Sequence, residues 1–181
     1  MELKNYWEKG LTPDAYAQLL GEKRDLHDLH YRRAKIDGEA VARLCRTVPH
    51  RVLVITEPWC GDSLAILPVV LKLFAEVGRS DIRIVRRDEN HDLMDRYLTR
   101  GARAVPIVIV LDQDYQERCH WGPRPRAAQE IFELHREKLQ AGRIDKTDVF
   151  KQIRAFYAKD RGTSIVHELV DLVNANADHA L

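Results

Sequence analysis

Cys60 is the residue whose type and setting are best suited to chemistry in this sequence. It lies in the segment Trp-Cys-Gly-Asp-Ser at positions 59–63. An apolar, β-branched run at residues 51–56 precedes this segment, and an apolar stretch from about 64 to 77 follows it, which predicts a buried strand, a turn and a helix. A cysteine at the start of a helix lies beside unpaired N–H groups and the positive end of the helix dipole. Because this setting stabilises a thiolate, we predict a nucleophilic Cys60 with a pKa below the free value of about 8.5.

The neighbours of Cys60 complete the predicted site. Ser63 follows by three residues and is expected to donate its hydroxyl to the sulfur, so Cys60 and Ser63 are assigned catalytic roles. Asp62 places a negative charge beside the thiolate and opposes a lowered pKa. Trp59 is expected to form an apolar wall beside the sulfur. The predicted substrate contacts in this turn are therefore Trp59, Gly61 and Asp62.

Periodicity and turn signals place further elements around this turn. The expected strands are residues 51–56, 82–86, 104–111 and 115–121, the last two forming a hairpin. Helices are expected within the first 48 residues, at about 64–77 and 91–100, and from 127 onward with breaks near 141–142 and 161–162. The resulting core has the order β-α-β-α-β-β-α.

This order resembles the thioredoxin superfamily, because a cysteine occupies the first strand-to-helix turn and Val105-Pro106 opens the third strand. Pro106 follows Cys60 by 46 residues, which suits the helix, strand and helix between them in that fold. More narrowly, the segments at 57–62, 87–90 and 121–125 resemble a bacterial thioredoxin-like family. The resemblance covers roughly residues 50–140. It implies an α/β fold with a mixed four-stranded sheet and added helices at both ends.

The resemblance also implies roles for residues far from the turn. In the superfamily the bond before the proline is cis and turns the preceding backbone outward to pair with an extended substrate strand. Val105 and Pro106 are therefore expected to bind substrate. Thioredoxins proper carry a second cysteine at the position of Ser63 and a buried aspartate at the position of Val54. Both departures predict a single-thiol protein that does not complete a dithiol cycle by itself.

Three further residues are weighed as contributors to the site. Glu57, three residues before Cys60, is a candidate to move protons in place of the missing aspartate. Arg103, three residues before Pro106, is a candidate to attract an acidic peptide or small thiol, with an exposed surface arginine as the alternative. The stiff segment at 121–125, Trp-Gly-Pro-Arg-Pro, either contacts substrate or directs the chain into the next helix, and the second interpretation is favoured.

Cys119 is the best internal candidate to resolve a mixed disulfide on Cys60. If the hairpin pairs Leu111 with Gln116, Cys119 lies opposite Val108, two strand spacings or roughly 10 Å from the Cys60 strand. A disulfide without backbone movement needs Cα atoms within about 7 Å. Cys45 is expected to lie still farther away, near the start of the first strand, roughly 20 Å from Cys60. We therefore expect an external thiol to be the resolver.

Three functions are compatible with these residues. The first is thiol–disulfide exchange through Cys60, with protein or low-molecular-weight thiols as partners. The second is a peptide-binding module without turnover. The third follows from the likeness of Cys-Gly-Asp-Ser to the turn of monothiol glutaredoxins, which hold an iron–sulfur cluster; the Gly-Gly-x-Asp of that family and its lysine before the turn are missing. The first is favoured, with no cofactor and no metal expected.

Composition limits the other classes of function. Lysine plus arginine number 29 and aspartate plus glutamate 28, so no strong net charge favours nucleic acid or membrane as a partner. No stretch approaches the roughly 18 apolar residues of a membrane span, and no leader is apparent, so a cytoplasmic location is expected.

His27 and His30, three apart on an expected helix, are interpreted as part of a solvated face. A single domain is expected, with a helical extension at 1–49, a core at 50–140 and a helical extension at 141–181.

Overall fold

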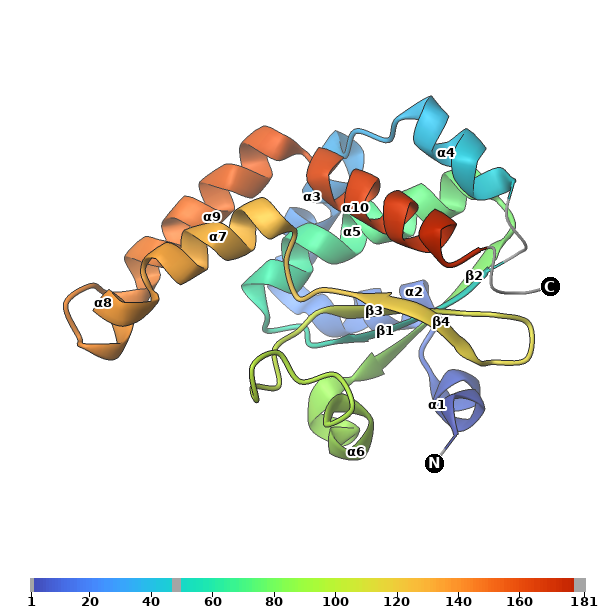
Figure 1. The fold of residues 1–181 in the computed structure, drawn as a ribbon, viewed down its shortest axis with the longest axis horizontal. Helices are drawn as coiled ribbons and strands as arrows, with labels where there is room; N and C mark the ends of the chain where they lie inside the picture. Colours follow the sequence, from blue (N-terminus) through green and yellow to red (C-terminus); the bar gives the residue numbers. More distant parts are fainter. Residues whose placement is uncertain (1, 47–49, 178–181) are drawn as a thin grey trace.

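The computed structural model describes residues 2–46 and 50–177 and has a mixed four-stranded sheet at its centre (Figure 1). The strands are β1 (His50–Thr56), β2 (Ser80–Arg86), β3 (Ile107–Leu111) and β4 (Glu117–Trp121), in the spatial order β2-β1-β3-β4. β1 is parallel to β2 and antiparallel to β3, and β3 is antiparallel to β4. The expected α/β class and the mixed sheet are confirmed.

Helices cover both faces of the sheet. Before β1 come α1 (Leu3–Lys9), α2 (Pro13–Ala17), the 3₁₀ segment η1 (Gln18–Lys23), α3 (Arg24–Arg33) and α4 (Gly38–Cys45). Between the strands lie α5 (Gly61–Val77), η2 (Arg87–Glu89) and α6 (His91–Met94). After β4 come α7 (Arg126–Leu134), α8 (Arg136–Gln140), α9 (Lys146–Asp160) and α10 (Thr163–Ala175). Figure 1 shows α3, α4, α5 and α10 on one side of the sheet and α1 and α6 on the other.

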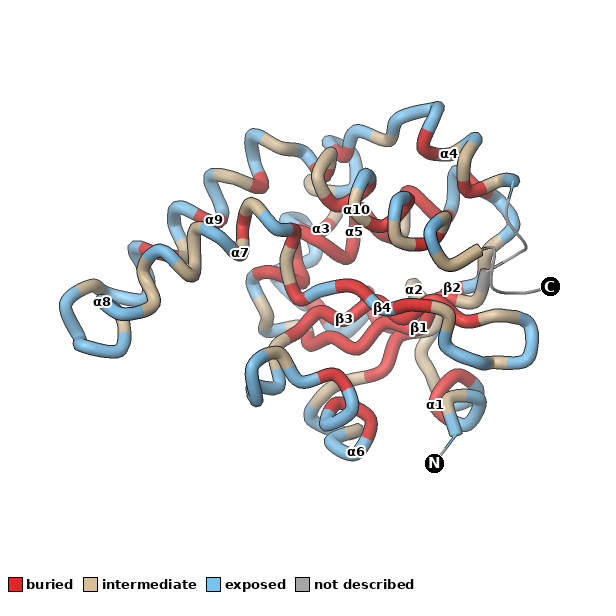
Figure 2. Tube along the Cα trace, viewed as in Figure 1, coloured by how far each residue is buried: buried red, intermediate tan, exposed pale blue. Residues whose placement is uncertain are grey.

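The alternation of side chains in β1 explains this two-sided cover. Val52 and Val54 pack into the cluster that contains α5, whereas Leu53 and Ile55 pack into the cluster with α1 and α6. All four are fully buried, as Figure 2 shows for the centre of the sheet. Successive residues of a strand point to opposite faces, so a continuous apolar run is what a strand covered on both sides requires.

The C-terminal helices pack on the same face as α5. Val149, Ile153 and Tyr157 of α9 and Ile165 and Leu169 of α10 belong to the cluster that α5 forms with the sheet. The apolar stripes of these helices are therefore used in packing against the sheet. No helix among the described residues has the length and apolar character that crossing a bilayer requires.

The segment between α6 and β3 differs from the expected helix at 91–100. α6 ends at Met94, and a short bridge joins Thr99 to Ala102. Arg100 and Gly101 at the tip of this reversal have positive φ angles of 51° and 80°, which a helix does not allow. β3 begins at Ile107 and not at 104, because Pro106 has no N–H to offer the sheet.

The β3–β4 hairpin has a different register from the expected one. Leu111 pairs with Glu117 and Val110 with Cys119, with a bulge between them. The Asp112 carboxylate accepts hydrogen bonds from the N–H groups of Asp114 and Gln116, which holds the turn in a longer loop. The expected pairing of Cys119 with Val108 is therefore wrong, and Cys119 lies two residues farther from Pro106 along the sheet.

Candidate active-site turn

Cys60 is the residue immediately before α5 and caps its N-terminus with extended backbone angles. Its carbonyl oxygen accepts a hydrogen bond from the N–H of Leu64, and its own N–H donates to the carbonyl oxygen of Glu57. The Cys60 thiol donates to the carbonyl oxygen of Val105, with 3.4 Å between Sγ and O. The structure thus places Cys60 beside Val105, which precedes Pro106, and the Val105–Pro106 peptide bond is cis.

Residues 121–125 lie against the Pro106 loop. Gly122 has a φ of 128°, and a Cβ atom at this position would come within 2.3 Å of the Pro106 carbonyl oxygen. Only glycine permits both this angle and this approach. At the other side of the segment, the Trp121 indole N–H donates to Glu168 of α10, 2.8 Å away. The segment therefore ties the Pro106 loop to the C-terminal helices.

The Cys60 pKa is raised from its ordinary value, mainly because burial disfavours the thiolate. The nearby Asp62 charge raises it further, while the Ser63 hydroxyl and the N–H groups of Ser63 and Asp62 lower it. The predicted lowering is therefore wrong. Cys60 is partly buried and packs against the cluster on the α1 and α6 side of the sheet, so desolvation outweighs the helix N-terminus.

Ser63 lies beside this sulfur and is almost fully buried, with 2% of its surface exposed. Among the described residues its hydroxyl has no hydrogen-bond partner, since the thiol proton is directed to Val105. A buried hydroxyl without a partner is uncommon, because the lost hydration is not replaced. When Cys60 ionises, this hydroxyl is placed to donate to the thiolate.

Asp62 points into the protein and not toward a substrate. Its carboxylate is buried and accepts a hydrogen bond from Arg124 Nε at 2.8 Å. The same carboxylate oxygen forms an ion pair with the guanidinium, 2.7 Å from Nη2. The Tyr157 hydroxyl of α9 donates to its other oxygen at 2.8 Å. The expectation of a substrate contact at Asp62 does not fit this burial. Its charge instead joins the first turn of α5 to the 121–125 segment and to α9.

Arg124 and Tyr157 were missed by the sequence interpretation. The Arg124 guanidinium also lies 4.7 Å from the ring centre of Phe132 and donates a hydrogen bond to the Gln129 side chain. The charge of Asp62 raises the pKa of the buried Tyr157 hydroxyl, after burial itself. The sequence shows Asp62 in the first turn of a helix and Arg124 between two prolines. No local pattern indicates that these two residues form a pair.

A thioredoxin family model matches residues 10–140, a span that includes the Cys60 turn, Val105-Pro106 and the 121–125 segment. The chain belongs to the thioredoxin family. Two solved structures share its fold. A crystal structure of a protein of unknown function from Pseudomonas aeruginosa has a TM-score of 0.72 and 16% identity, and the match covers 98% of this chain and 99% of that one. An HIV epitope scaffold has a TM-score of 0.73 and 15% identity, with 97% and 99% covered. A comparison with curated proteins finds no match.

Trp59 lies at the surface of this thioredoxin-family turn, with half of its own surface accessible. The Arg87 guanidinium lies 4.6 Å from its ring centre, and its indole N–H donates to Asp88 at 3.2 Å. Gly61 is exposed as well. The Trp59 ring is therefore held at the surface beside Cys60. This is the position that the expected apolar wall beside the sulfur requires.

Glu57 and Arg103 both use their charges within the protein. Glu57 is fully buried and accepts from the Asp88 N–H at 2.8 Å and from Arg86 at 3.4 Å, on the side of β2. Arg103 is exposed, and Asp95 engages its guanidinium with two hydrogen bonds of 2.7 and 2.8 Å. Because the Arg103 guanidinium is already paired with Asp95, it is not free to attract an acidic ligand. The interpretation of Arg103 as a surface arginine is therefore favoured.

Cys119 is buried in the cluster on the α5 side of the sheet, whereas the Cys60 sulfur packs on the opposite side. Burial raises the pKa of Cys119 to about 11. Cys45 is partly buried, with its thiol directed to the Val77 carbonyl oxygen at the far end of α5. The arrangement therefore places neither thiol within reach of Cys60.

The raised pKa predicts how Cys60 reacts with pH. A variant with Cys45→Ser and Cys119→Ser leaves Cys60 as the one thiol. Its alkylation rate by iodoacetamide should rise with a midpoint above the free-cysteine value of about 8.5, because the folded state binds the thiol proton more tightly. The same protein unfolded in denaturant serves as the control. A folded-state midpoint at or below the unfolded one contradicts the burial argument.

Proposed function

We propose that this protein carries out thiol–disulfide exchange through Cys60 and that an external thiol resolves the mixed disulfide. The observation that supports this most strongly is the position of the Cys60 sulfur. It lies at the N-terminus of α5, 3.4 Å from the Val105 carbonyl oxygen, with the unpartnered Ser63 hydroxyl beside it. The half-exposed Trp59 borders the same turn.

The proposed cycle has two displacement steps. Cys60 loses its proton to solvent, and the thiolate attacks one sulfur of a disulfide, forming a Cys60 mixed disulfide and releasing the other half as a thiolate. The thiolate of an external thiol then attacks the substrate sulfur of the mixed disulfide. This attack releases the Cys60 thiolate and leaves a new disulfide, so the bound disulfide is exchanged without net electron transfer to the protein.

The residues around the sulfur have distinct parts in this cycle. Ser63 and the first N–H groups of α5 stabilise the thiolate when it forms and when it leaves. Burial keeps the resting thiol protonated and makes Cys60 a poorer leaving group than a low-pKa cysteine. The mixed disulfide is therefore expected to be long-lived. We place the protein in the cytoplasm, where low-molecular-weight thiols would supply the second step.

Exchange with a chromogenic aromatic disulfide, dithiobis-nitrobenzoate, tests this proposal. The Cys45→Ser/Cys119→Ser variant should release one equivalent of thionitrobenzoate under native conditions, and adding Cys60→Ser should abolish the release. Intact mass then shows whether the adduct is on Cys60. If the native double variant reacts no faster than a buried thiol such as Cys119 alone, Cys60 is not an exchange nucleophile.

The raised Cys60 pKa also favours a second candidate, a peptide-binding module without turnover. In that case Trp59 and the Val105 backbone would hold an extended chain, and the thiol would be dispensable. Partners recovered with the wild-type protein would then be recovered equally with Cys60→Ser in the presence of reductant. Loss of partners in Cys60→Ser favours the covalent function.

A further inference from the structure

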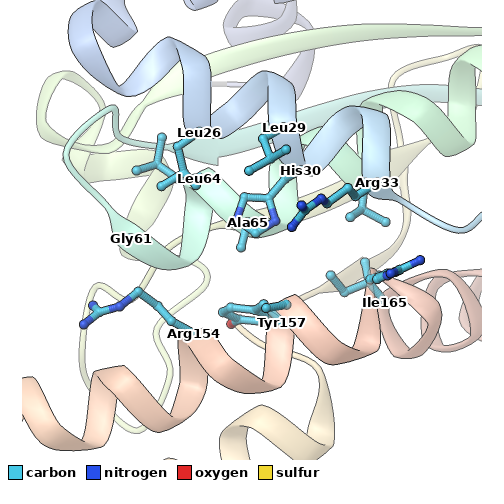
Figure 3. A pocket seen from close by; sticks show the side chains of 14 residues that line it. Leu26, Leu29, His30, Arg33, Gly61, Leu64, Ala65, Arg154, Tyr157 and Ile165 are labelled. Atoms are coloured by element: carbon cyan, nitrogen blue, oxygen red, sulfur yellow. The ribbon is translucent and has the colours of Figure 1, made fainter.

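A cavity of about 370 Å³ lies between α3, the start of α5 and α9, and Cys60 is not among the residues that line it (Figure 3). Gly61 forms part of its wall, whereas the thiol of the neighbouring Cys60 is directed to the Val105 carbonyl oxygen, and Val105 does not line the cavity. This volume lies within the range of pockets that hold small molecules. The proposed exchange reaction does not use the cavity.

The inner wall of the cavity is apolar. Leu26 from α3, Leu64 and Ala65 from α5 and Ile165 from α10 contribute aliphatic surface, and the Tyr157 ring closes one side. Leu26 is 43% exposed although it is a large aliphatic residue. An apolar body that filled the cavity would cover this surface, which gains free energy in proportion to the area removed from water.

The charges around the cavity all have one sign. Arg33, Arg154 and Arg161 line it, and no aspartate or glutamate does. Within the described parts of the chain, none of these three guanidinium groups has a hydrogen bond or ion pair with another side chain. Most other arginines near the site, such as Arg86, Arg103 and Arg124, are paired with carboxylates. The cavity therefore presents cationic groups that no side chain in the described residues neutralises.

The cationic groups lie at both ends of the cavity. Arg154 lies in the middle of α9 and Arg161 directly follows its last residue. Seven residues separate them, about 10 Å along the helix axis at about 1.5 Å per residue. Figure 3 shows Arg154 at the Gly61 end and Arg33 toward the other end, with His30 and Tyr157 between them.

The histidines of α3 differ from the expected solvated face. His27 is buried, so that expectation is wrong for this residue, and His30 is partly buried. Burial, helped by His27 and Arg33, lowers the His30 pKa, so its ring is neutral near pH 7 and can pack against an apolar body.

We propose that this cavity binds a small organic dianion that has an apolar middle and a carboxylate or phosphate group at each end. Guanidinium groups form paired hydrogen bonds with carboxylates and phosphates, and they do so with less loss of hydration than ammonium groups. Arg154 binds one end, and Arg33 with Arg161 binds the other. The apolar middle lies between Leu64 and the Tyr157 ring. This function is independent of the exchange reaction at Cys60.

Calorimetric titration with three probes of similar length tests the proposal: octanedioate, octanoate and octanediol. Octanedioate should bind most tightly, octanoate more weakly, and octanediol without detectable affinity. Arg154→Gln or Arg33→Gln should each weaken octanedioate about tenfold, the value of one charge-assisted hydrogen-bonded pair. Both arginines are exposed, so these variants should fold. Ala158→Phe, from an exposed position on α9 that lines the cavity, should fill the cavity and abolish binding.

Arg32→Gln is the matched control, because Arg32 is exposed on α3 beside Arg33 but does not line the cavity. It should leave octanedioate affinity unchanged. Cys60→Ser should also bind octanedioate as the wild type does, which separates this proposal from the exchange function. Failure of octanedioate to bind at millimolar concentration, equal binding of the diol, or an equal loss in Arg32→Gln would each overturn the proposal.

Discussion

Replacing Arg124 by methionine is expected to lower the free energy of unfolding by about 3–5 kcal/mol. The change leaves the Asp62 carboxylate buried without its cation, because the hydrogen bond and the ion pair from the guanidinium are lost and only the Tyr157 hydroxyl remains. Methionine keeps much of the volume between Phe132 and the turn, so the main loss is electrostatic. Urea or guanidinium unfolding, followed by circular dichroism, measures the change.

Two variants keep this result interpretable. Arg126→Met removes a neighbouring exposed arginine and should change stability by less than about 0.5 kcal/mol. The double change of Arg124→Met with Asp62→Asn should cost less than the sum of the single changes, because neither charge is then left alone. If Arg124→Met costs no more than Arg126→Met, the buried pair does not hold the turn to the 121–125 segment.

Gly122→Ala is expected to cost about 3 kcal/mol, from backbone strain together with overpacking. The φ of 128° is unfavourable for any residue with a Cβ atom, and that atom would lie 2.3 Å from the Pro106 carbonyl oxygen. Either the 121–125 segment or the Pro106 loop must move. Movement of the loop would also separate Val105 from the Cys60 thiol, so alkylation of Cys60 should become faster as stability falls.

Gly38→Ala is the matched control for this substitution. Gly38 begins α4, and a Cβ atom there meets nothing within 4 Å. Stability should stay the same or rise by up to about 1 kcal/mol, because alanine lowers the entropy of the unfolded chain. Equal stability of Gly122→Ala and the wild type would mean that the close contact with Pro106 is not a feature of the molecule in solution.

Local patterns in the sequence predicted the elements that carry Cys60. The β-branched run before it and the apolar stretch after it correspond to β1 and α5, since strand and helix periodicities are set by neighbours in the chain. The place of Val105 and Pro106 in the site was expected from family resemblance and not from periodicity. The family model that matches residues 10–140 supports the fold on which that expectation rests.

Properties that depend on burial and on distant pairing were not predictable in this way. The sign of the Cys60 pKa shift depends on how much of the sulfur is desolvated, which no local pattern reports. The position of Cys119 depended on a bulge and on the Asp112 turn. Asp62 was expected to contact substrate, but Arg124 and Tyr157, which pair with it inside the protein, are brought to it only by the tertiary fold.

The fate of a mixed disulfide on Cys60 tests the central claim most directly. The wild-type protein, with all three thiols present, is reacted with oxidised glutathione, freed of excess reagent and followed by intact mass without added thiol. We predict one glutathione adduct on Cys60 that persists, and its removal only when an external thiol is added. Spontaneous loss of the adduct with formation of a disulfide from Cys60 to Cys119 or Cys45 would contradict the claim that Cys60 depends on a thiol from outside the protein.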